Sequence, residues 1–195
     1  MRIITGKLKG RRFDAPKDMK VRPTSDRAKE GLFNVIEARR YIDGANVLDL
    51  FAGSGNLGFE AISRGAMQAL MVEASPVAVK QIEKTAAQFG ISDEVTAYCL
   101  PVERFLTQRP VPYDLVFADP PYDLPGIPEM VETVVHGGWL AEDGWFILEH
   151  DVRHLFHEHP NCVFTKPYGR TVVSIFMQNT ETDDARESES ETERD

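Results

Sequence analysis

The sequence is poor in cysteine and contains no long apolar run. Its two cysteines, Cys99 and Cys162, stand in no Cys-x-x-Cys or other metal-ligand spacing, which excludes a disulfide framework and a cysteine zinc site. No apolar stretch approaches the roughly 20 residues that a membrane span needs, and the segment after Met1 lacks the apolar centre of a signal peptide. We therefore expect a cytoplasmic, monomeric protein with reduced thiols and no membrane partner.

A metal-ligand pattern is also missing. Four histidines fall close together at His150, His154, His157 and His159, but their spacing matches neither the zinc proteases nor the zinc deaminases. We expect a solvent-facing segment there and no metal.

The net charge of −9 conceals an uneven distribution of charge. Residues 1–40 carry 12 Lys and Arg against 5 Asp and Glu, residues 41–178 carry 8 against 18, and residues 179–195 carry 2 against 8. Local charge, and not the average, decides where a polyanion can bind. We expect a basic N-terminal extension over 1–40, one folded domain over 41–178, and a disordered acidic tail over 179–195, which has no apolar side chain larger than alanine.

From residue 45, short apolar runs alternate with amphipathic segments, which is typical of a mainly parallel sheet covered by helices on both faces. The expected strands are 45–51, 69–73, 95–100, 113–118, 145–149, 163–166 and 171–177, and the expected helices are 56–64, 76–89, 101–107 and 128–136. Because only a short turn separates the last two strands, they should form an antiparallel hairpin. The predicted fold class is α/β, with a seven-stranded, mostly parallel sheet.

The basic extension should contain a small hairpin over residues 2–13, bent at the glycine-containing turn 6–10, and then a helix after Pro23. Leu32 and Ile36 lie on the apolar face of that helix. Basic side chains crowd the extension and are candidate phosphate contacts of a nucleic acid: Lys7, Lys9, Arg11, Arg12, Arg22 and Arg27, with Lys20 and Lys29.

A strand that ends in a glycine-rich turn forms the first candidate site. Gly53, Gly55 and Gly58 match the Gly-x-Gly-x-x-Gly fingerprint of dinucleotide-binding proteins. Asp49, at the strand end, argues against a pyrophosphate, because a carboxylate repels phosphate. It suits the ammonium and sulfonium charges of S-adenosylmethionine, and the glycines let a ligand approach the backbone closely. Glu73 ends the next strand, where an acid can accept both hydroxyls of a ribose.

The second candidate site is Asp119-Pro120-Pro121-Tyr122, which follows an apolar run. Each proline fixes its own φ and lacks an N–H, so the turn is stiff and offers carbonyl oxygens with few competing donors. Asp119 and the Pro120 carbonyl can accept both hydrogens of an exocyclic amine while Tyr122 stacks on the attached ring. Methyl transfer to a base amine needs this geometry. The plain alternative is a strand-ending turn with a buried tyrosine.

Residues 49–58, Glu73 and residues 119–122 together resemble the cofactor and catalytic motifs of Rossmann-like (class I) S-adenosylmethionine-dependent methyltransferases. The segment Arg-Pro-Thr-Ser-Asp-Arg at 22–27 precedes a helix, and Tyr-Gly stands late in the chain at 168–169. With these additions the chain resembles the RsmD family of bacterial 16S rRNA guanine-N2 methyltransferases, along its whole length except the acidic tail.

The resemblance implies S-adenosylmethionine as cofactor and 16S rRNA, within an assembling small ribosomal subunit, as substrate. The catalytic residues that it implies are Asp119, Pro120 and Tyr122. The cofactor-binding residues that it implies are Asp49, Phe51, Gly53, Gly55, Glu73, Ala74 and Asp119. Backbone groups of the loop before Glu103 would hold the adenine.

Three alternatives stay open at the level of sequence. An adenine-N6 methyltransferase on RNA or DNA would use the same Asp-Pro-Pro-Tyr turn, because adenine also carries an NH2 on a ring. An NAD-dependent oxidoreductase would use the same glycine fingerprint. A non-catalytic RNA-binding module would retain the pocket without its chemistry, although the intact acids at 49, 73 and 119 argue against it.

Overall fold

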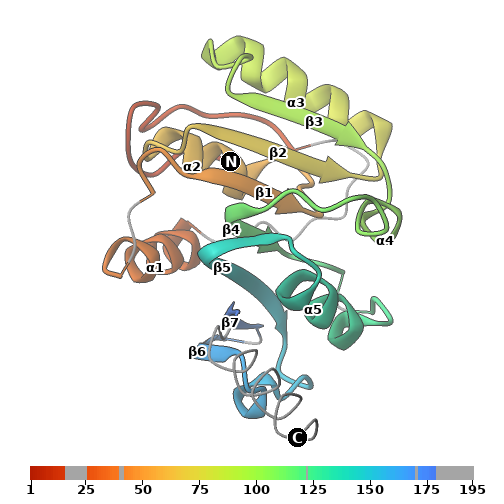
Figure 1. Cartoon of the computed structure of the whole chain (residues 1–195). Helices are drawn as coiled ribbons and strands as arrows, with labels where there is room; N and C mark the ends of the chain where they lie inside the picture. The colour runs from red at the N-terminus through yellow and green to blue at the C-terminus, as the bar shows by residue number, and fades with distance from the viewer. Residues whose placement is uncertain (16–25, 40–41, 122, 170, 179–195) are drawn as a thin grey trace, which may run out of the picture.

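The computed structural model describes residues 1–15, 26–39, 42–121, 123–169 and 171–178 (Figure 1). The elements are α1 (Asp26–Glu37), β1 (Asn46–Leu50), α2 (Asn56–Ser63), β2 (Gln68–Glu73), α3 (Pro76–Phe89), β3 (Val95–Cys99), α4 (Val102–Phe105), β4 (Tyr113–Ala118), α5 (Ile127–His136), β5 (Leu140–Asp151), the 3-10 helix η1 (Phe156–Glu158), β6 (Cys162–Tyr168) and β7 (Thr171–Met177). Arg22, Tyr122 and the tail 179–195 lie outside the described residues.

The strands form one seven-stranded sheet in the order β3-β2-β1-β4-β5-β7-β6. Strands β1 to β5 pair in parallel, and β7 pairs antiparallel with both β5 and β6. The predicted α/β fold with a C-terminal antiparallel hairpin is therefore confirmed. The strand order reverses at β1, which has β2 on one side and β4 on the other, and ligands of open α/β sheets bind beyond the strand ends at such a point.

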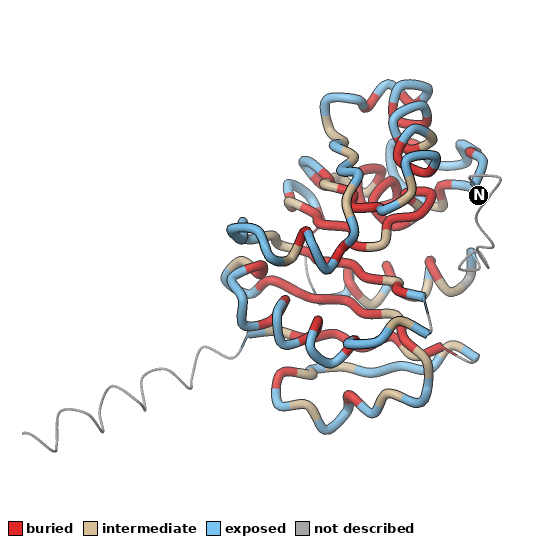
Figure 2. The backbone as a smooth tube through the Cα atoms, turned by 90° about the vertical axis from the view of Figure 1, so that its right-hand side faces the viewer, coloured by how far each residue is buried: buried red, intermediate tan, exposed pale blue. Residues whose placement is uncertain are grey.

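Helices cover both faces of the sheet, and the buried backbone runs through its central strands (Figure 2). One apolar cluster joins the sheet to α1, α2 and α3, with Phe33 on α1 packing against Phe117 of β4 at 5.7 Å between ring centroids. A second cluster joins the opposite face to α4 and α5. None of the helices in the described part of the chain has the length and apolarity that crossing a membrane requires.

Two elements differ from the sequence prediction. Strand β5 begins at Leu140, five residues before the expected start, because Tyr113 pairs with Leu140 while Leu115 pairs with Trp145. The intervening polar residues form a bulge in which Asp143 has φ 58°. Helix α4 is also only one turn long, over Val102–Phe105, where residues 101–107 were expected to be helical.

The first fifteen residues lie along α2. Arg2 and Arg12 form the antiparallel bridge of the predicted hairpin, and Ile3, Leu8 and Phe13 are buried in the same apolar cluster as the residues of α2. The extension therefore shares its apolar core with the sheet domain.

A buried ion network fastens this hairpin to the domain. Glu60 on α2 is fully buried, and its oxygens accept from the backbone N–H groups of Ile4 (2.9 Å) and Thr5 (3.0 Å). The same carboxylate pairs with Lys29 (3.0 Å) and Arg64 (2.9 Å). The expectation that Lys29 contacts phosphate is wrong, because its side chain is 1% exposed and engaged inside the protein.

Candidate active site

Four acidic side chains meet at the carboxyl edge of the sheet. Glu73 ends β2, Asp49 lies in β1, Asp119 follows β4, and Glu149 lies near the end of β5. These four strands are direct neighbours in the sheet. Three of the acids were predicted from the sequence as site residues, and Glu149 was not. We call these four residues the acid row.

The strand register puts the acid row on one face. Ala118 and Leu148 pair across β4 and β5, and both are buried in the cluster on the α4–α5 side. Because successive side chains of a strand point to opposite faces, Asp119 and Glu149 project together toward the face covered by α1 to α3. The same alternation applies to the other two acids, since Leu48, Leu50 and Val72 belong to the α4–α5 side.

Asp49 is the most deeply buried member of the acid row, at 2% exposure. Its Oδ2 accepts from the backbone N–H of Gly58 in the first turns of α2, at 2.9 Å. The pKa of Asp49 is raised to about 7, chiefly by burial; the hydrogen bond from Gly58 opposes the rise, and the charges of Asp119 and Glu73 add to it. A cationic ligand beside Asp49 would relieve this unfavourable burial of charge.

Glu73 closes the glycine turn. One carboxylate oxygen accepts from the N–H of Gly53 at 2.9 Å, and the other accepts from the N–H of Ser75 at 2.8 Å. The side chain is 9% exposed, and Ala74 next to it is exposed. Glu73 thus fixes the turn and leaves each oxygen a second lone pair, which the predicted ribose contact would use.

The turn itself is strained where it leaves β1. Phe51 has φ 57°, an uncommon value for a residue with a side chain, and such conformations cluster at functional sites. Gly55 starts α2 with φ 79°. A Cβ on Gly55 would lie 2.7 Å from Phe59 and 3.0 Å from Met71, so internal packing requires this glycine. The sequence had indicated a different reason, the close approach of a ligand.

Asp119 and Pro120 begin the stiff turn after β4. Asp119 is half-buried and Pro120 is buried, whereas Pro121 is exposed. Burial raises the pKa of Asp119 to about 6. Asp119 and Glu73 both lie close enough to Asp49 for their charges to raise its pKa. The structure therefore brings the three acids together, as the sequence indicated. The predicted stacking residue Tyr122 lies outside the described residues.

Glu149 is the site residue that sequence reasoning missed. Its pKa is raised to about 7, chiefly by burial and further by the Asp119 charge, against the lowering effect of a hydrogen bond from the Thr171 side chain. The signal was present in the sequence, since Glu149 ends an expected strand of the same sheet. No recognisable motif surrounds it, so the local sequence does not mark it as a site residue.

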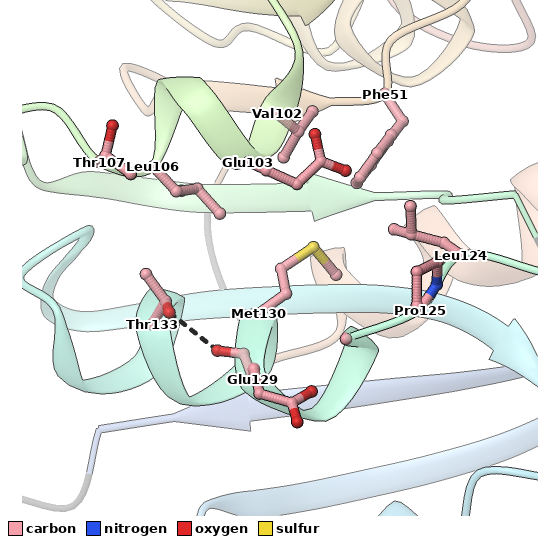
Figure 3. A pocket seen from close by; sticks show the side chains of 11 residues that line it. Phe51, Val102, Glu103, Leu106, Thr107, Leu124, Pro125, Glu129, Met130 and Thr133 are labelled. Carbon is pink, nitrogen blue, oxygen red and sulfur yellow. Dashed lines mark hydrogen bonds between the residues drawn. The ribbon is translucent and has the colours of Figure 1, made fainter.

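A pocket of about 300 Å³ opens beside the glycine turn, between α4 and α5 (Figure 3). Phe51, Val102, Leu106, Leu124 and Met130 form most of its apolar wall, together with Pro125. Glu103 lines it as well. Phe51 therefore connects the end of β1 with an apolar space large enough for a flat ring.

The basic residues of the hairpin lie in different surroundings. Lys7 forms an ion pair with Glu94, and Arg11 lies over the ring of Phe89, 5.4 Å from its centroid. Lys9 and Arg12 are exposed. Arg22 and the side chain of Arg27 lie outside what the structure describes.

The hairpin spans the length of α2, so that its two ends lie at opposite ends of that helix. The Arg2–Arg12 end lies near the glycine turn, where the Ser54 hydroxyl contacts the Met1 sulfur at 3.0 Å. The turn end lies at the other end of α2, where the N–H of Lys7 donates to Ser63 O at 2.7 Å. An eight-residue helix, about 12 Å, separates the two ends.

The clustered histidines have protein partners. The prediction of a solvent-facing segment is wrong at His150, which is buried in β5 with its Nε2 2.8 Å from the Ser174 hydroxyl. His159 contacts Glu132 at 3.0 Å. Among the residues that the structure describes, no group of three or more His, Cys, Asp or Glu could hold a metal ion.

The sheet order, the glycine turn after β1 and the acids at the strand ends define a Rossmann-like (class I) methyltransferase. The chain belongs to the RsmD family: the family model described as "Conserved hypothetical protein 95" matches residues 1–177.

Individual relatives agree with this assignment. Ribosomal RNA small subunit methyltransferase D of Escherichia coli K12 is 36% identical over 154 residues, which are 78% of this chain and 75% of that protein. YlbH of Bacillus subtilis is 34% identical over 184 residues, 91% of this chain and 99% of that protein. The solved structure of yhhF from Escherichia coli superimposes with a TM-score of 0.80 at 31% identity, covering 92% of this chain and 99% of the other.

Proposed function

We propose that this protein transfers the methyl group of S-adenosylmethionine to the exocyclic N2 of a guanine in 16S rRNA of the small ribosomal subunit. The observation that carries the proposal is the acid row beside the glycine turn, with the rigid Asp119-Pro120 bend at its centre. The name of the Escherichia coli relative, a small-subunit rRNA methyltransferase, supports rRNA as the substrate class.

The residues at the strand ends fit the cofactor. S-adenosylmethionine, when bound, supplies a methyl group on a positively charged sulfur. The Asp49 carboxylate, buried and already destabilised as an anion, would balance the positive charges of the ligand. Glu73 would accept the ribose hydroxyls, and the N–H groups at the start of α2 would bind the carboxylate. The apolar pocket beside Phe51 would take the adenine ring.

Asp119 and the Pro120 carbonyl would hold the target amine. The lone pair of guanine N2 is delocalised into the ring, so N2 is a poor nucleophile. Two acceptors that bind its hydrogens turn the lone pair toward the methyl carbon, which is chiefly a positioning and electrostatic effect. The nitrogen would then bond to the methyl carbon, the sulfur would keep the electron pair of the broken bond, and the proton released from N2 would pass by way of the Asp119 carboxylate to solvent. Tyr122 would stack on the base once it is turned out of the RNA.

The basic extension 1–40 would contact phosphates of an assembling ribosomal particle, while the domain 41–178 carries the chemistry. Lys9 and Arg12 support this role best, because both are exposed. Lys7 and Arg11 already have partners on the protein, so RNA must compete with Glu94 and Phe89 for them. Arg22 and Arg27 complete the proposed surface. Such contacts position RNA without reading its sequence.

One experiment tests the whole proposal. The protein is incubated with isotopically labelled S-adenosylmethionine and small ribosomal subunits from a strain that lacks the enzyme, and the labelled base is mapped. We expect N2-methylguanine at a single position of 16S rRNA. Label at adenine N6 would assign the chain to the rival methyltransferase reaction. Titration with NADH under the same conditions should give no binding, and binding of NADH in place of S-adenosylmethionine would overturn the cofactor assignment.

A further inference from the structure

Glu149 lies level with Asp119 on the adjacent strand. The last pair that joins β4 and β5 is Ala118 with Leu148, and each acid is the next residue of its strand. Neighbouring parallel strands lie about 4.8 Å apart, and side chains at matched positions point the same way. The backbones of the two acids are therefore about one strand spacing apart, and the Asp119 charge acts directly on Glu149.

Thr171 orients Glu149, and among the side chains that the structure describes no positively charged one forms an ion pair with it. The Thr171 side chain, from the neighbouring strand β7, makes a hydrogen bond to it. Glu149 is half-buried, whereas Leu148 and His150 on either side of it are buried in the protein. Burial and the charge of Asp119 both raise the pKa of Glu149, the latter because two neighbouring acceptors repel each other. A ligand edge that presents several N–H groups would stabilise both carboxylates.

The Watson–Crick edge of guanine presents such donors in a row, with the ring N1–H next to the exocyclic N2 amine. Adenine presents an amine next to a bare N1, which is an acceptor. An ionised carboxylate attracts the N1–H of guanine and repels the bare N1 of adenine. The residue that faces ring N1 therefore decides which of the two bases can place its amine against Asp119.

We propose that Glu149 is the residue that selects guanine, by accepting the ring N1–H while Asp119 and the Pro120 carbonyl hold the N2 amine. This inference rests on the proposed function and adds to it the group that recognises the base. Asp119 grips an amine that both bases possess, and Glu149 reads the ring atom by which they differ. Thr171 acts as a positioning residue, because it holds the Glu149 carboxylate from β7.

The test compares two bases at the position mapped above. Splint-ligated 16S rRNA fragments carry either guanine or 2-aminopurine, which keeps the amine but has no hydrogen on N1. Assays are run at pH 8.5, where a carboxyl with a pKa of about 7 is ionised. We expect the wild-type protein to prefer guanine by about 10- to 100-fold in kcat/KM. In Glu149→Gln the side-chain amide can donate to the bare N1, so this preference should fall by about tenfold or more.

Glu142→Gln is the matched control, because Glu142 is an exposed acid at the opposite end of the same strand. It should keep the wild-type preference. The preference is a ratio within one protein sample, so partial unfolding of a variant lowers both rates and leaves the ratio unchanged.

Two results would overturn the inference while leaving the proposed function intact. One is equal use of guanine and 2-aminopurine by the wild-type protein, a measurement that needs no variant. The other is an unchanged preference in Glu149→Gln, with both rates falling together. Failure of the proposed function looks different, because the wild-type protein would then put no label on guanine N2.

Discussion

Replacing Glu60 by glutamine should destabilise the protein strongly, although Glu60 lies away from the acid row. The substitution keeps the size of the side chain and one acceptor oxygen, but it removes a fully buried negative charge. Lys29 then loses the anion 3.0 Å away, and Arg64 loses one of two, since it keeps Glu37 at 2.9 Å. Breaking a buried ion pair by removing one partner costs about 3–5 kcal/mol, and we expect a loss of free energy of unfolding in that range.

The pH dependence of this loss identifies its cause. Burial lowers the pKa of Lys29, and the charge of Glu60 opposes that shift. In Glu60→Gln the folded lysine should release its proton well below the unfolded value. The unfolded state then binds more protons than the folded state, so the stability of the variant rises with pH in the window below about 10.5. The gap between variant and wild type should narrow between pH 7 and pH 9.5.

Urea denaturation monitored by circular dichroism gives the free energies. A loss of this size lowers the midpoint by at least about 1 M urea for a chain of this length. The control is Glu37→Gln, which removes the half-exposed partner of Arg64 and should cost no more than about 1 kcal/mol. A loss below about 1 kcal/mol at pH 7 for Glu60→Gln would refute the view that removing Glu60 leaves the charge of Lys29 buried without a partner.

Three further predictions concern the site. Asp119→Ala should lower methyl transfer by at least about 100-fold but retain S-adenosylmethionine binding in calorimetry. Binding is retained because the Asp119 charge acts on Asp49 only by raising its pKa, so its loss leaves the Asp49 carboxylate in place for the cofactor. Full activity of the variant would remove Asp119 from the mechanism. Affinity for S-adenosylmethionine should rise about eightfold from pH 6 to 7.5 as Asp49 ionises with a pKa of about 7. Asp49→Asn should show no such pH dependence. A flat wild-type profile would contradict the view that the Asp49 carboxylate balances the positive charges of the cofactor. Replacing Lys9, Arg11 and Arg12 by alanine should reduce the salt slope of RNA binding by about one unit for each lost phosphate contact; an unchanged slope places the RNA elsewhere.

The sequence predicted the sheet well where apolar runs were continuous. The strand at 113–118 was predicted with the limits that β4 has, and so was the helix at 76–89, which Ser75 caps and Gly90 ends. The first half of β5 was missed, because its polar residues 142 and 143 interrupt the apolar pattern. Local pattern cannot show that an irregular polar segment pairs with a neighbouring strand, since that pairing depends on the register of residues far apart in the chain.

The candidate site was predicted in the parts that have a local signature. Asp49 and Glu73 lie at the ends of buried strands and Asp119 follows one, and a recognisable turn comes after each. Glu149 has no such turn, and its place became evident only when β5 was aligned with β4. Lys29 shows the opposite limit: one lysine among many basic residues gave no indication that its partner would be Glu60, 31 positions later and inside the protein.

If the proposed function holds, the acid row also limits the shape of the nucleic acid that can enter. Asp119 and Glu149, the half-buried members of the row, would repel the sugar–phosphate chain, so a nucleotide would have to arrive with its base foremost and its phosphates held back from the edge. A guanine paired in a helix hides the very edge that would meet these acids. The enzyme would therefore modify its nucleotide only while that nucleotide is unpaired and exposed. It would lose access once the surrounding RNA folds and buries the nucleotide.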